Sequence, residues 1–573
     1  MWVFCEADDN IRYVNKVEEK LIEEEEVERN GELLFCGGTS WDTLSNYGHP
    51  NNTHGNLISP TRLTPLIGVN IRYVAAGCAS SHCVALDVEG RVYTWGKNKR
   101  GQLGHGDMIN RDRPTIVSGL SGHKIIKAGA GRAHTVVVTN DGKSFAFGWN
   151  KHGQCGTGSV RTEFQQSPVS SQVSEVTNVV CGGDFTVWLS SVEGSSILTA
   201  GLPQYGQLGH GTDNEYNTKS SAVNLAYEAQ PHPKAIAAFA GKKIVKVACG
   251  TNHTVAVDFE GVVYTWGYGA YGRLGHREPK DEWTPRVVAL FQKKNVLPPN
   301  AIVAAGAHNC AVTAGGGQLY MWGKLKVAGE DWMYPKPLLT LSGWNIRCMG
   351  SSATHNLVGA EKSCISWGNA QYGELGYGPE GPKTAVNPKK IDVLEGMHVM
   401  SVACGSYYSM VVVDRTNVGD KLDQLDVYDG KASEEGTAEA KAKSPAPKKG
   451  GAEASSKRKK SKDSSESTEP KAVSPAPKKG GAKASSSKRK KKSTGSPESE
   501  NEEDERDGGG CENGSDDDEN GHVEERKRGG GKGGRGNGAK SPAASGRGRG
   551  RSPSAEKKTR RGAGGKRGRP RKS

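Results

Sequence analysis

The feature that most constrains this chain is a phrase of about twenty residues that recurs along its first three quarters. In one clear copy, Val247–Val257 is an apolar run that contains Cys-Gly-Thr-Asn-His, and Glu260–Gly267 is a second run that ends in Trp-Gly. Two short apolar runs around an Xaa-Gly turn predict a β-hairpin. Aligned on the glycine of the first run (Ala79 in the first copy), the copies start at residues 79, 131, 182, 250, 306, 350 and 405, about 54 residues apart on average.

The two ends of this repeat complete each other. The last copy stops after one strand near Asp414, whereas Leu33–Gly37 looks like a later strand of a copy that has no beginning. An open ring of sheets would leave unpaired strand edges at both ends, and pairing these two strands removes them. Units of this length with three or four strands are typical of propeller blades. We therefore predict an all-β fold, a seven-bladed β-propeller over residues 32–414 that is closed by its N- and C-terminal strands.

A second phrase follows most hairpins, and we call it the turn phrase. It reads Gly-Gln-Leu-Gly-His or a close variant, at Gly101–His105, Gly206–His210, Gly272–His276 and Gly373–Gly376. Its two glycines allow tight turns with positive φ, and the leucine between them can point inward.

The charge divides the chain into a body and a tail. Residues 429–573 hold 38 basic and 23 acidic residues, a net charge of +15, and no Phe, Trp or Tyr. A segment of this composition cannot bury a core, so we predict a disordered basic tail after a linker at 415–428. Residues 1–31 are acidic and are predicted to form a short helix.

Several classes of protein are excluded by composition. No run of about 18 apolar residues occurs, so no membrane association is expected. The acidic start from Met1 is the opposite of a secretory signal, so the chain is not expected to be secreted. The twelve cysteines form no Cys-x-x-Cys pair, which argues against a metal site or disulfides and suits the reducing cytosol or nucleus. No nucleophile–base pair, phosphate loop or paired-carboxylate motif is present, so we expect no catalytic residue, metal or cofactor.

The recurring phrases identify a family resemblance. Ala-Cys-Gly-x-x-His, Trp-Gly and Gly-Gln-Leu-Gly-His recur in register and resemble the regulator of chromosome condensation repeat, over residues 33–414. Tyr271–His276, Met333–Lys336 and Gly343–Arg347 resemble one mitotic branch of that family. The resemblance implies a nuclear or mitotic protein that binds chromatin or microtubule-associated partners and acts on small GTPases.

Two departures limit this resemblance. The founding exchange factor of the family binds DNA through a basic N-terminal arm, whereas residues 1–31 here are acidic, and no exchange wedge can be matched residue by residue. A plant photoreceptor with the same repeat uses Gly-Trp-Arg-His-Thr phrases. The corresponding phrases here, Gly131–Thr135 and Gly250–Thr254, lack that tryptophan, which argues against light sensing.

Recurring polar and aromatic residues are predicted to be structural. A blade repeat spreads one position around the ring, so histidines at that position cannot converge on a metal; we interpret them as hydrogen-bonded residues between blades. Tryptophans of the Trp-Gly strands fill space between sheets, and cysteines before the turn glycine act as small apolar residues. The residues concerned are His82, His134 and His253, then His105, His210 and His276, then Trp95, Trp266, Trp322 and Trp367, and finally Cys181, Cys249 and Cys404.

Loops that break the repeat are candidate binding sites. One long connection lies between His210 and Lys243, and after Gly323 the turn phrase is missing altogether. Aromatic residues and cations that replace it would suit a protein contact, since such residues dominate binding hot spots. Packing beneath their own blade is the alternative. The predicted contact residues are Lys324, Lys326, Trp332, Met333 and Tyr334.

The tail carries a run that resembles an AT-hook. Arginines on either side of a glycine can enter the narrow, negative minor groove of A·T-rich DNA, and flanking cations can contact phosphates. The predicted DNA-binding residues are Lys566, Arg567, Gly568, Arg569, Pro570, Arg571 and Lys572.

Further basic clusters precede this run. They are predicted to bind nucleic acid or to direct nuclear import, and the Gly-Arg repeat can also bind RNA. They comprise Lys457, Arg458, Lys459 and Lys460, then Lys488, Arg489, Lys490, Lys491 and Lys492, then Arg547, Arg549 and Arg551.

Five serines of the tail each precede a proline among these cations: Ser444, Ser474, Ser496, Ser541 and Ser552. Phosphorylation there would add about −1.5 to −2 charges per site and weaken binding to DNA.

Three functions follow as hypotheses. The first is a monomeric nuclear regulatory protein whose propeller binds protein partners, including small GTPases, and whose tail binds chromatin or A·T-rich DNA. The second is a guanine-nucleotide exchange factor for a Ran- or Rac-like small GTPase. The third is an RNA-associated nucleolar protein that uses the Gly-Arg segment.

Overall fold

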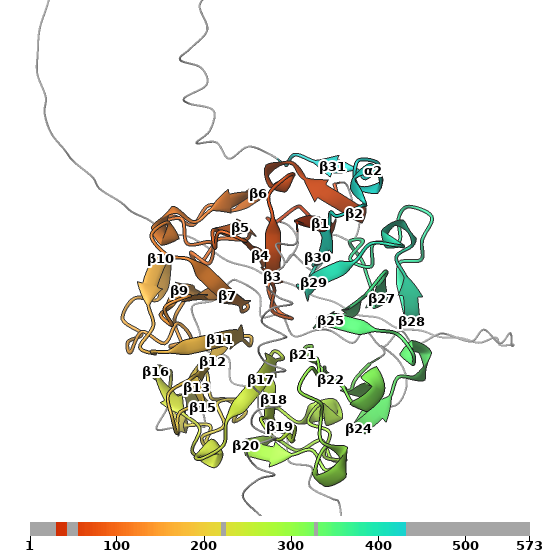
Figure 1. Ribbon diagram of the computed structural model, residues 1–573. Helices are drawn as coiled ribbons and strands as arrows, with labels where there is room; N and C mark the ends of the chain where they lie inside the picture. The colour runs from red at the N-terminus through yellow and green to blue at the C-terminus, as the bar shows by residue number, and fades with distance from the viewer. Residues whose placement is uncertain (1–29, 43–54, 219–224, 326–330, 431–573) are drawn as a thin grey trace, which may run out of the picture. The chain divides into compact units, whose positions relative to one another are not determined.

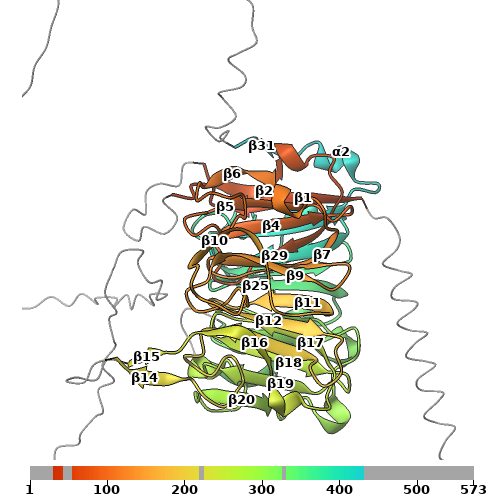
Figure 2. The same ribbon diagram turned by 90° about the vertical axis from the view of Figure 1, so that its left-hand side faces the viewer.

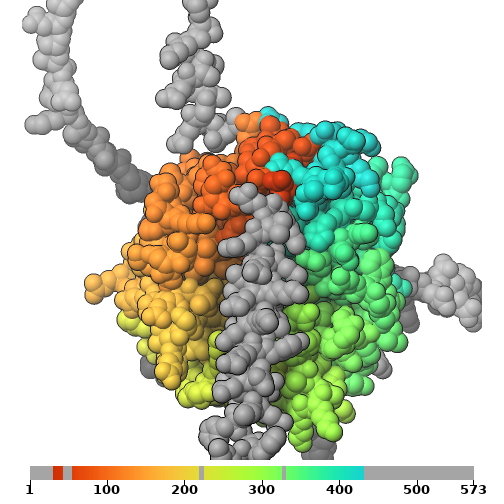
Figure 3. All heavy atoms as spheres, viewed as in Figure 1, coloured from red at the N-terminus to blue at the C-terminus, as the bar shows by residue number. Residues whose placement is uncertain are grey.

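The computed structural model describes residues 30–42, 55–218, 225–325 and 331–430. The expectations for residues 1–29 and for the tail fall outside these ranges. Within them, seven sheets follow one another round a ring (Figure 1): six have four antiparallel strands, and the seventh has four antiparallel strands and a fifth at its rim. Figure 3 shows the same order as successive sectors of the surface. The seven-bladed propeller predicted from the repeat is confirmed.

Each blade begins with a strand at the centre of the ring and ends with a strand at the rim, as its strand order shows. Blades one to three consist of β3 (Ile71–Ala75), β4 (His82–Asp87), β5 (Val92–Gly96) and β6 (Arg111–Ile116); β7 (Ile125–Ala130), β8 (His134–Thr139), β9 (Ser144–Trp149) and β10 (Phe164–Ser170); and β11 (Val176–Cys181), β12 (Phe185–Ser190), β13 (Ile197–Gly201) and β16 (Gln230–Ala235). Blades four to six consist of β17 (Ile244–Cys249), β18 (His253–Asp258), β19 (Val263–Gly267) and β20 (Glu282–Val287); β21 (Val303–Ala305), β22 (Asn309–Thr313), β23 (Leu319–Gly323) and β24 (Trp332–Pro337); and β25 (Ile346–Ser351), β26 (His355–Ala360), β27 (Cys364–Asn369) and β28 (Thr384–Lys390).

Blade seven is built from both ends of the described chain. Its order is β29 (Val399–Cys404), β30 (Tyr408–Asp414), β1 (Gly31–Gly37) and β2 (Leu57–Leu63). Strand β1 pairs with β30 along its whole length, from Gly31 opposite Asp414 to Gly37 opposite Tyr408. The two strands that the sequence left incomplete therefore close the ring, as predicted.

The core lies between neighbouring blades. Apolar residues of adjacent sheets form seven buried clusters, and the tryptophans of the Trp-Gly strands, Trp95, Trp266, Trp322 and Trp367, are buried in them. Short 3-10 turns line the connections: η1 (Thr64–Leu66), η2 (Ser118–Leu120), η3 (Ala237–Phe239), η4 (Ala270–Gly272), η5 (Lys293–Asn295), η6 (Gly315–Gly317), η7 (Leu339–Leu341) and η8 (Asp392–Leu394). In the described ranges, no helix has the length and apolar character needed to cross a bilayer.

Residues 415–428, predicted as a linker, fold onto blade seven, and we call them the C-terminal clasp. They form α2 (Gly419–Leu422) and β31 (Val427–Tyr428), which adds to the rim strand β2 in parallel. Val418, Leu422 and Leu425 of the clasp are buried against the blade. The prediction was wrong because burial of these isolated apolar residues holds the segment in place, without any strand-like alternation in sequence.

The connections divide between two sides of the ring. Loops after the first and third strands of each blade leave on one side, which we call the turn face, because successive strands are antiparallel. Loops after the second and fourth strands, together with Gly31 and Asp414, lie on the other side. The long connection after His210 forms a hairpin of β14 (Glu215–Asn217) and β15 (Leu225–Tyr227), which extends away from the propeller in Figure 2.

Candidate protein-binding surface on blades four and five

Histidines at the recurring position link neighbouring blades. His82 Nε2 lies 2.7 Å from Thr135 Oγ1 of the next blade, and that hydroxyl donates at 2.8 Å to the carbonyl of Gln102 in the blade of the histidine. His134 makes the same contact to Thr186 at 3.0 Å. Burial lowers the pKa of both imidazoles, to about 3 for His82 and about 4 for His134, so they stay neutral at physiological pH. The predicted structural role between blades is confirmed.

A fourth histidine of this set was missed in the sequence. His355 Nε2 lies 2.8 Å from Ser409 Oγ in the next blade. The alignment placed the sixth copy on Gly350, but the loop that corresponds to Gly131 begins at Ser352, whose N–H bonds the carbonyl of His355. Counting three residues back from the histidine would have found the register.

Histidines of the turn phrase are also structural. His105, His210 and His276 each place Nε2 2.9 Å from a threonine of the third strand in their own blade. Burial lowers the pKa of all three to about 4. These imidazoles are neutral at physiological pH, and their bonds to the threonines hold the turn.

The second position of the turn phrase sets the local backbone. In most blades its side-chain oxygen accepts the N–H of the residue two places earlier, which holds the turn closed. The acceptors are Gln102 for Arg100, Gln154 for His152, Gln207 for Tyr205 and Glu374 for Tyr372, at distances of 2.9, 3.0, 2.7 and 2.8 Å.

Blade four breaks this rule, because Arg273 occupies the second position. A guanidinium only donates, so it cannot accept the N–H of Tyr271. Arg273 Nε donates instead to the carbonyl of Ala270 at 2.9 Å, and Nη1 to that of Ala307 in blade five at 2.7 Å. Tyr271 takes a left-handed conformation with φ of 60°, which costs a non-glycine residue about 1 kcal/mol.

Arg273 is a buried cation without an acidic partner. The residue is 2 % exposed, and its Nη2 has no hydrogen-bond partner. Its guanidinium carbon lies 4.5 Å from the ring centroid of Tyr268 and 5.4 Å from that of Tyr271. Burial lowers the pKa of Arg273, which means that the site disfavours the positive charge that it holds.

A second cation shares the Tyr271 ring. Lys324 Nζ lies 4.9 Å from its centroid, and the ring of His308 packs edge-on against it at 5.4 Å. Burial, with help from Arg273 and Lys324, lowers the pKa of His308 to about 4. His308 is therefore neutral, and the cations that contact the Tyr271 ring are Arg273 and Lys324.

The predicted contact residues of blade five adjoin this group. Trp332, Met333 and Tyr334 begin β24, and Tyr334 is 41 % exposed. Lys336 Nζ lies 5.2 Å from the ring centroid of Trp332 and 5.3 Å from that of Tyr334. Lys326, the fifth predicted contact residue, lies outside the described residues.

Blades four and five are joined along this strand. The N–H of Arg277 donates at 2.8 Å to the carbonyl of Met333, and its guanidinium carbon lies 4.8 Å from the ring centroid of Tyr334. Arg277 has a φ of 68° where glycine stands in blades one, two, three and six, so the cation is held there against backbone preference. We call Tyr268, Tyr271, Arg273, Arg277, Lys324, Trp332, Tyr334 and Lys336 the aromatic–cation surface.

Acidic groups near this surface are already engaged. Glu278 and Glu282 both pair with Arg286, at 2.7 and 2.6 Å. Asp281 accepts the N–H of Gly269 at 2.8 Å. In the part of the chain that the structure describes, no carboxylate forms an ion pair with Arg273 or Lys324. The surface can therefore offer its cations to an external anionic group.

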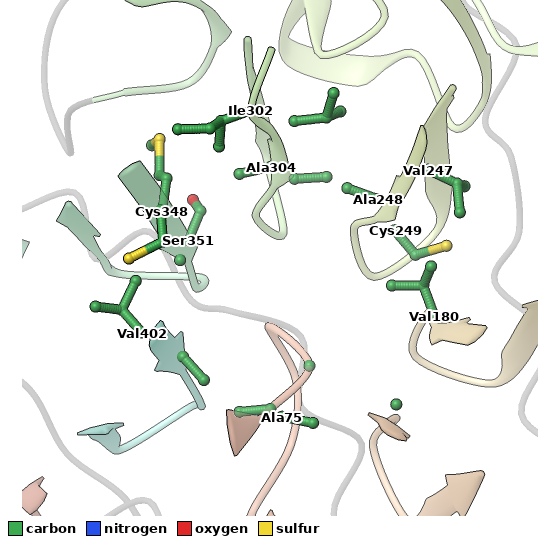
Figure 4. Close-up of a pocket in the computed structure, with 18 of the residues that line it drawn as sticks. Ala75, Val180, Val247, Ala248, Cys249, Ile302, Ala304, Cys348, Ser351 and Val402 are labelled. Carbon is green, nitrogen blue, oxygen red and sulfur yellow. The ribbon is translucent and has the colours of Figure 1, made fainter. Parts of the chain in front are cut away.

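The central channel is a further hollow in the propeller. It encloses a cavity of about 530 Å³ lined by the innermost strands, and Figure 4 shows mostly small apolar and sulfur-bearing side chains around it, among them Val247, Cys249 and Ile302. Cys78 Sγ lies 3.3 Å from Thr251 Oγ1, which links blades one and four at its turn-face end. Burial raises the pKa of Cys181 to about 12, so this thiol stays protonated. The described residues contain no group of three metal-ligand side chains.

Comparison with known protein families identifies the family to which the repeat is similar. The model of the regulator of chromosome condensation (RCC1) repeat matches residues 89–138, 141–189, 196–257, 260–312 and 363–412, and a second model of the same repeat matches 71–102, 125–154 and 244–273. These matches cover blades one to four and extend into blades five, six and seven, in agreement with the family resemblance of the phrases.

Two curated relatives illustrate the sequence similarity. Protein RCC2 of Homo sapiens is 36 % identical over 403 residues, which cover 67 % of this chain and 76 % of that protein. This agrees with the branch of the family that Tyr271–His276, Met333–Lys336 and Gly343–Arg347 resemble. Ultraviolet-B receptor UVR8 of Arabidopsis thaliana is 30 % identical over 353 residues, 60 % of this chain and 75 % of that one.

Solved structures agree on the fold. The structure of Prp20p from Saccharomyces cerevisiae, a protein described with its binding to Gsp1p and histones, has a TM-score of 0.52 at 20 % identity. The match covers 69 % of this chain and 96 % of Prp20p. At that identity the likeness concerns the propeller itself.

Proposed function

We propose that this chain, which belongs to the regulator of chromosome condensation (RCC1) repeat family, is a nuclear regulatory protein that binds partners through two separate parts. Membership of the family gives a propeller with a regulatory or binding role. The propeller holds protein partners on the aromatic–cation surface, and the tail at 429–573 holds the chain on DNA. No covalent chemistry is part of this proposal.

The aromatic–cation surface supports the first part. Binding hot spots are rich in Trp, Tyr and Arg, and this surface combines all three with lysines that flank them. Trp332 and Tyr334 lie on a rigid strand, so little conformational entropy is lost on docking. The single observation that carries the proposal is the set of cations on this surface that have aromatic neighbours and no acidic partner.

A small GTPase is the partner class that the relatives favour. The yeast propeller protein Prp20p is described with binding to Gsp1p and histones, and exchange activity toward a Ran- or Rac-like GTPase is the alternative function for this chain. An exchange factor speeds nucleotide release, whereas a scaffold binds the GTPase without that effect. Release of a fluorescent nucleotide from the GTPase therefore separates the two.

Variants of the surface test the propeller. The double substitution Lys324→Ala and Tyr334→Ala is expected to weaken binding of full-length protein to its GTPase or histone partner at least tenfold, because it removes one cation and one exposed ring. Binding to purified Ran-class and Rac-class GTPases and to histones is measured by biolayer interferometry. Phe259→Ala, an exposed aromatic on the opposite side of the ring, is the matched control and is expected to bind normally. Normal binding by the double variant as well would place the contact elsewhere.

Charge supports the second part. The tail has a net charge of +15 and ends in the AT-hook-like run from Lys566 to Lys572. Neutralising phosphates releases counterions, so such binding is strong at low salt and falls steeply as salt rises. Phosphorylation at the five Ser-Pro sites would weaken it. RNA binding through the Gly-Arg segment, in the nucleolus, is the second alternative.

Removal of the tail is expected to reduce affinity for duplex DNA at least tenfold at physiological salt and to flatten its salt dependence. Arg567→Ala with Arg569→Ala in the full chain should remove the preference for A·T-rich over G·C-rich duplexes with a smaller loss of affinity. Fluorescence anisotropy with matched duplexes measures both. Unchanged affinity after truncation at Tyr428 would reject the tether, and stronger binding to single-stranded RNA would favour the alternative.

A further inference from the structure

We propose that Arg273, under the ring of Tyr271 between blades four and five, is the base of an anion-binding site that takes a carboxylate side chain from an acidic segment of a partner protein. This deepens the proposed function, because it gives the chemistry of the partner at the aromatic–cation surface.

Replacement of an acceptor by a cation at a repeat position is the first argument. Blades one, two and three carry glutamine there, which satisfies the turn without any charge. Arginine in blade four leaves that bond unmade and places a charge in a dry environment. Three blades have the neutral glutamine at this position, whereas blade four has an arginine that loses a hydrogen bond and buries a charge. Such departures from local preference are typical of functional positions.

The free end of the guanidinium is the second argument. Nε and Nη1 each donate to a backbone carbonyl, which fixes the group, and Nη2 is the nitrogen that has no partner. A buried donor without a partner is unfavourable unless a ligand completes it. One fixed nitrogen suits a single carboxylate oxygen, whereas a phosphate with three strong acceptor oxygens would call for more donors.

Tyr271 is the third argument. Tyr271 is 40 % exposed, and its ring covers the guanidinium of Arg273, which is buried. The backbone of Tyr271 is in the left-handed region. Movement of the Tyr271 side chain is the step that this proposal requires for access to Arg273, whose guanidinium Tyr268 also contacts. Lys324, which lies against the same ring, would then face the incoming carboxylate as a second cation.

Photocrosslinking in the full-length protein tests the site. The probe is a hexaglutamate peptide with a terminal benzophenone, and adducts are mapped by peptide mass spectrometry. The basic tail will also capture this probe, and its adducts serve as an internal reference. In the native chain we expect adducts on blades four and five near Arg273. Arg273→Gln, which restores the glutamine of blades one to three, should reduce them at least fivefold relative to the tail adducts.

Two further variants keep the test decisive. Tyr271→Gly suits the left-handed backbone and removes the cover, so it should keep or increase the adducts in blades four and five. Glu374→Gln changes the same repeat position in blade six and should leave them unchanged. Equal adducts in Arg273→Gln, with its melting temperature preserved, would overturn the site. Preferential capture of a phosphoserine peptide would overturn the carboxylate assignment. If Arg273→Gln loses adducts while GTPase and histone binding are unaffected, the anion site stands and the partner proposal fails.

Discussion

Glu32→Ala is expected to lower the free energy of unfolding by about 3 to 5 kcal/mol, because it leaves two buried or half-buried guanidinium groups without their counter-ion. Glu32 lies in β1 and is 1 % exposed. Its carboxylate accepts from Arg62 Nε at 3.0 Å and pairs with Arg415 Nη1 at 3.3 Å. No other described carboxylate replaces it at these positions, since Asp423 contacts Arg62 from the solvent side.

The effect is large because this one side chain joins three parts of the closure. Arg62 belongs to the rim strand β2, and Arg415 is the first residue of the C-terminal clasp. Arg62 Nη1 also donates to the carbonyl of Leu422 at 3.3 Å and to Asp423 at 2.8 Å, which fixes α2 against the blade. Loss of Glu32 therefore loosens the pairing that seals the ring as well as the clasp that covers it.

Urea unfolding of the full chain, followed by tryptophan fluorescence, measures the change, with the tail serving as a constant background. Glu89→Gln is the matched control. Glu89 pairs with Arg91 at 3.0 Å, but both side chains are largely exposed, so this substitution should change the free energy of unfolding by less than about 1 kcal/mol. A similar small change for Glu32→Ala would show that the closure does not depend on its ion pairs.

The closure itself could be predicted from the sequence because it is a matter of counting strands. A half-unit at Leu33–Gly37 and another that ends at Asp414 have only one arrangement that removes both edges. The clasp could not be predicted in this way. Leu422 and Leu425 are isolated apolar residues among charged ones, and they are buried in a cluster with residues from both ends of the chain, such as Leu34 and Val411.

The blade-five part of the candidate site could be predicted from the sequence, and the blade-four part could not. Loss of the turn phrase after Gly323 indicated that blade five is unusual, and Trp332 and Tyr334 lie where that break predicts a surface. The role of Arg273 is not evident from the sequence, because the pattern of the turn phrase specifies its two glycines and its leucine and leaves the second position open. The signal was there, since a donor stands at Arg273 where Gln102 and Gln207 are acceptors. The significance of this difference becomes clear only from the hydrogen bonds, which show that the second position normally accepts a backbone N–H.

Blade six carries the opposite charge at this repeat position. Glu374 is 2 % exposed, and its Oε2 accepts the N–H of Tyr372 at 2.8 Å, as glutamine does elsewhere. Burial raises the pKa of this carboxyl to about 7, from an ordinary value of 4.5. The folded protein therefore binds this proton more tightly than the unfolded chain does. The associated stability is complete below pH 4.5 and is lost as the pH rises to about 7.

Glu374→Gln should remove this dependence, because an amide keeps the acceptor and never ionises. A difference of about 2.5 in pKa corresponds to roughly 3 kcal/mol. The variant should therefore gain on the native protein by about 2 to 3 kcal/mol between pH 5 and pH 8, measured by urea unfolding at each pH. Comparison of the two proteins cancels the titration of the buried histidines that they share. Gln207→Glu, the reciprocal change in blade three, should introduce a loss of the same sign. A difference in the free energy of unfolding between Glu374→Gln and the native protein that stays constant with pH would contradict this prediction. It would show that the carboxyl titrates as an ordinary one and that a charge at the second position of the turn phrase does not destabilise the fold.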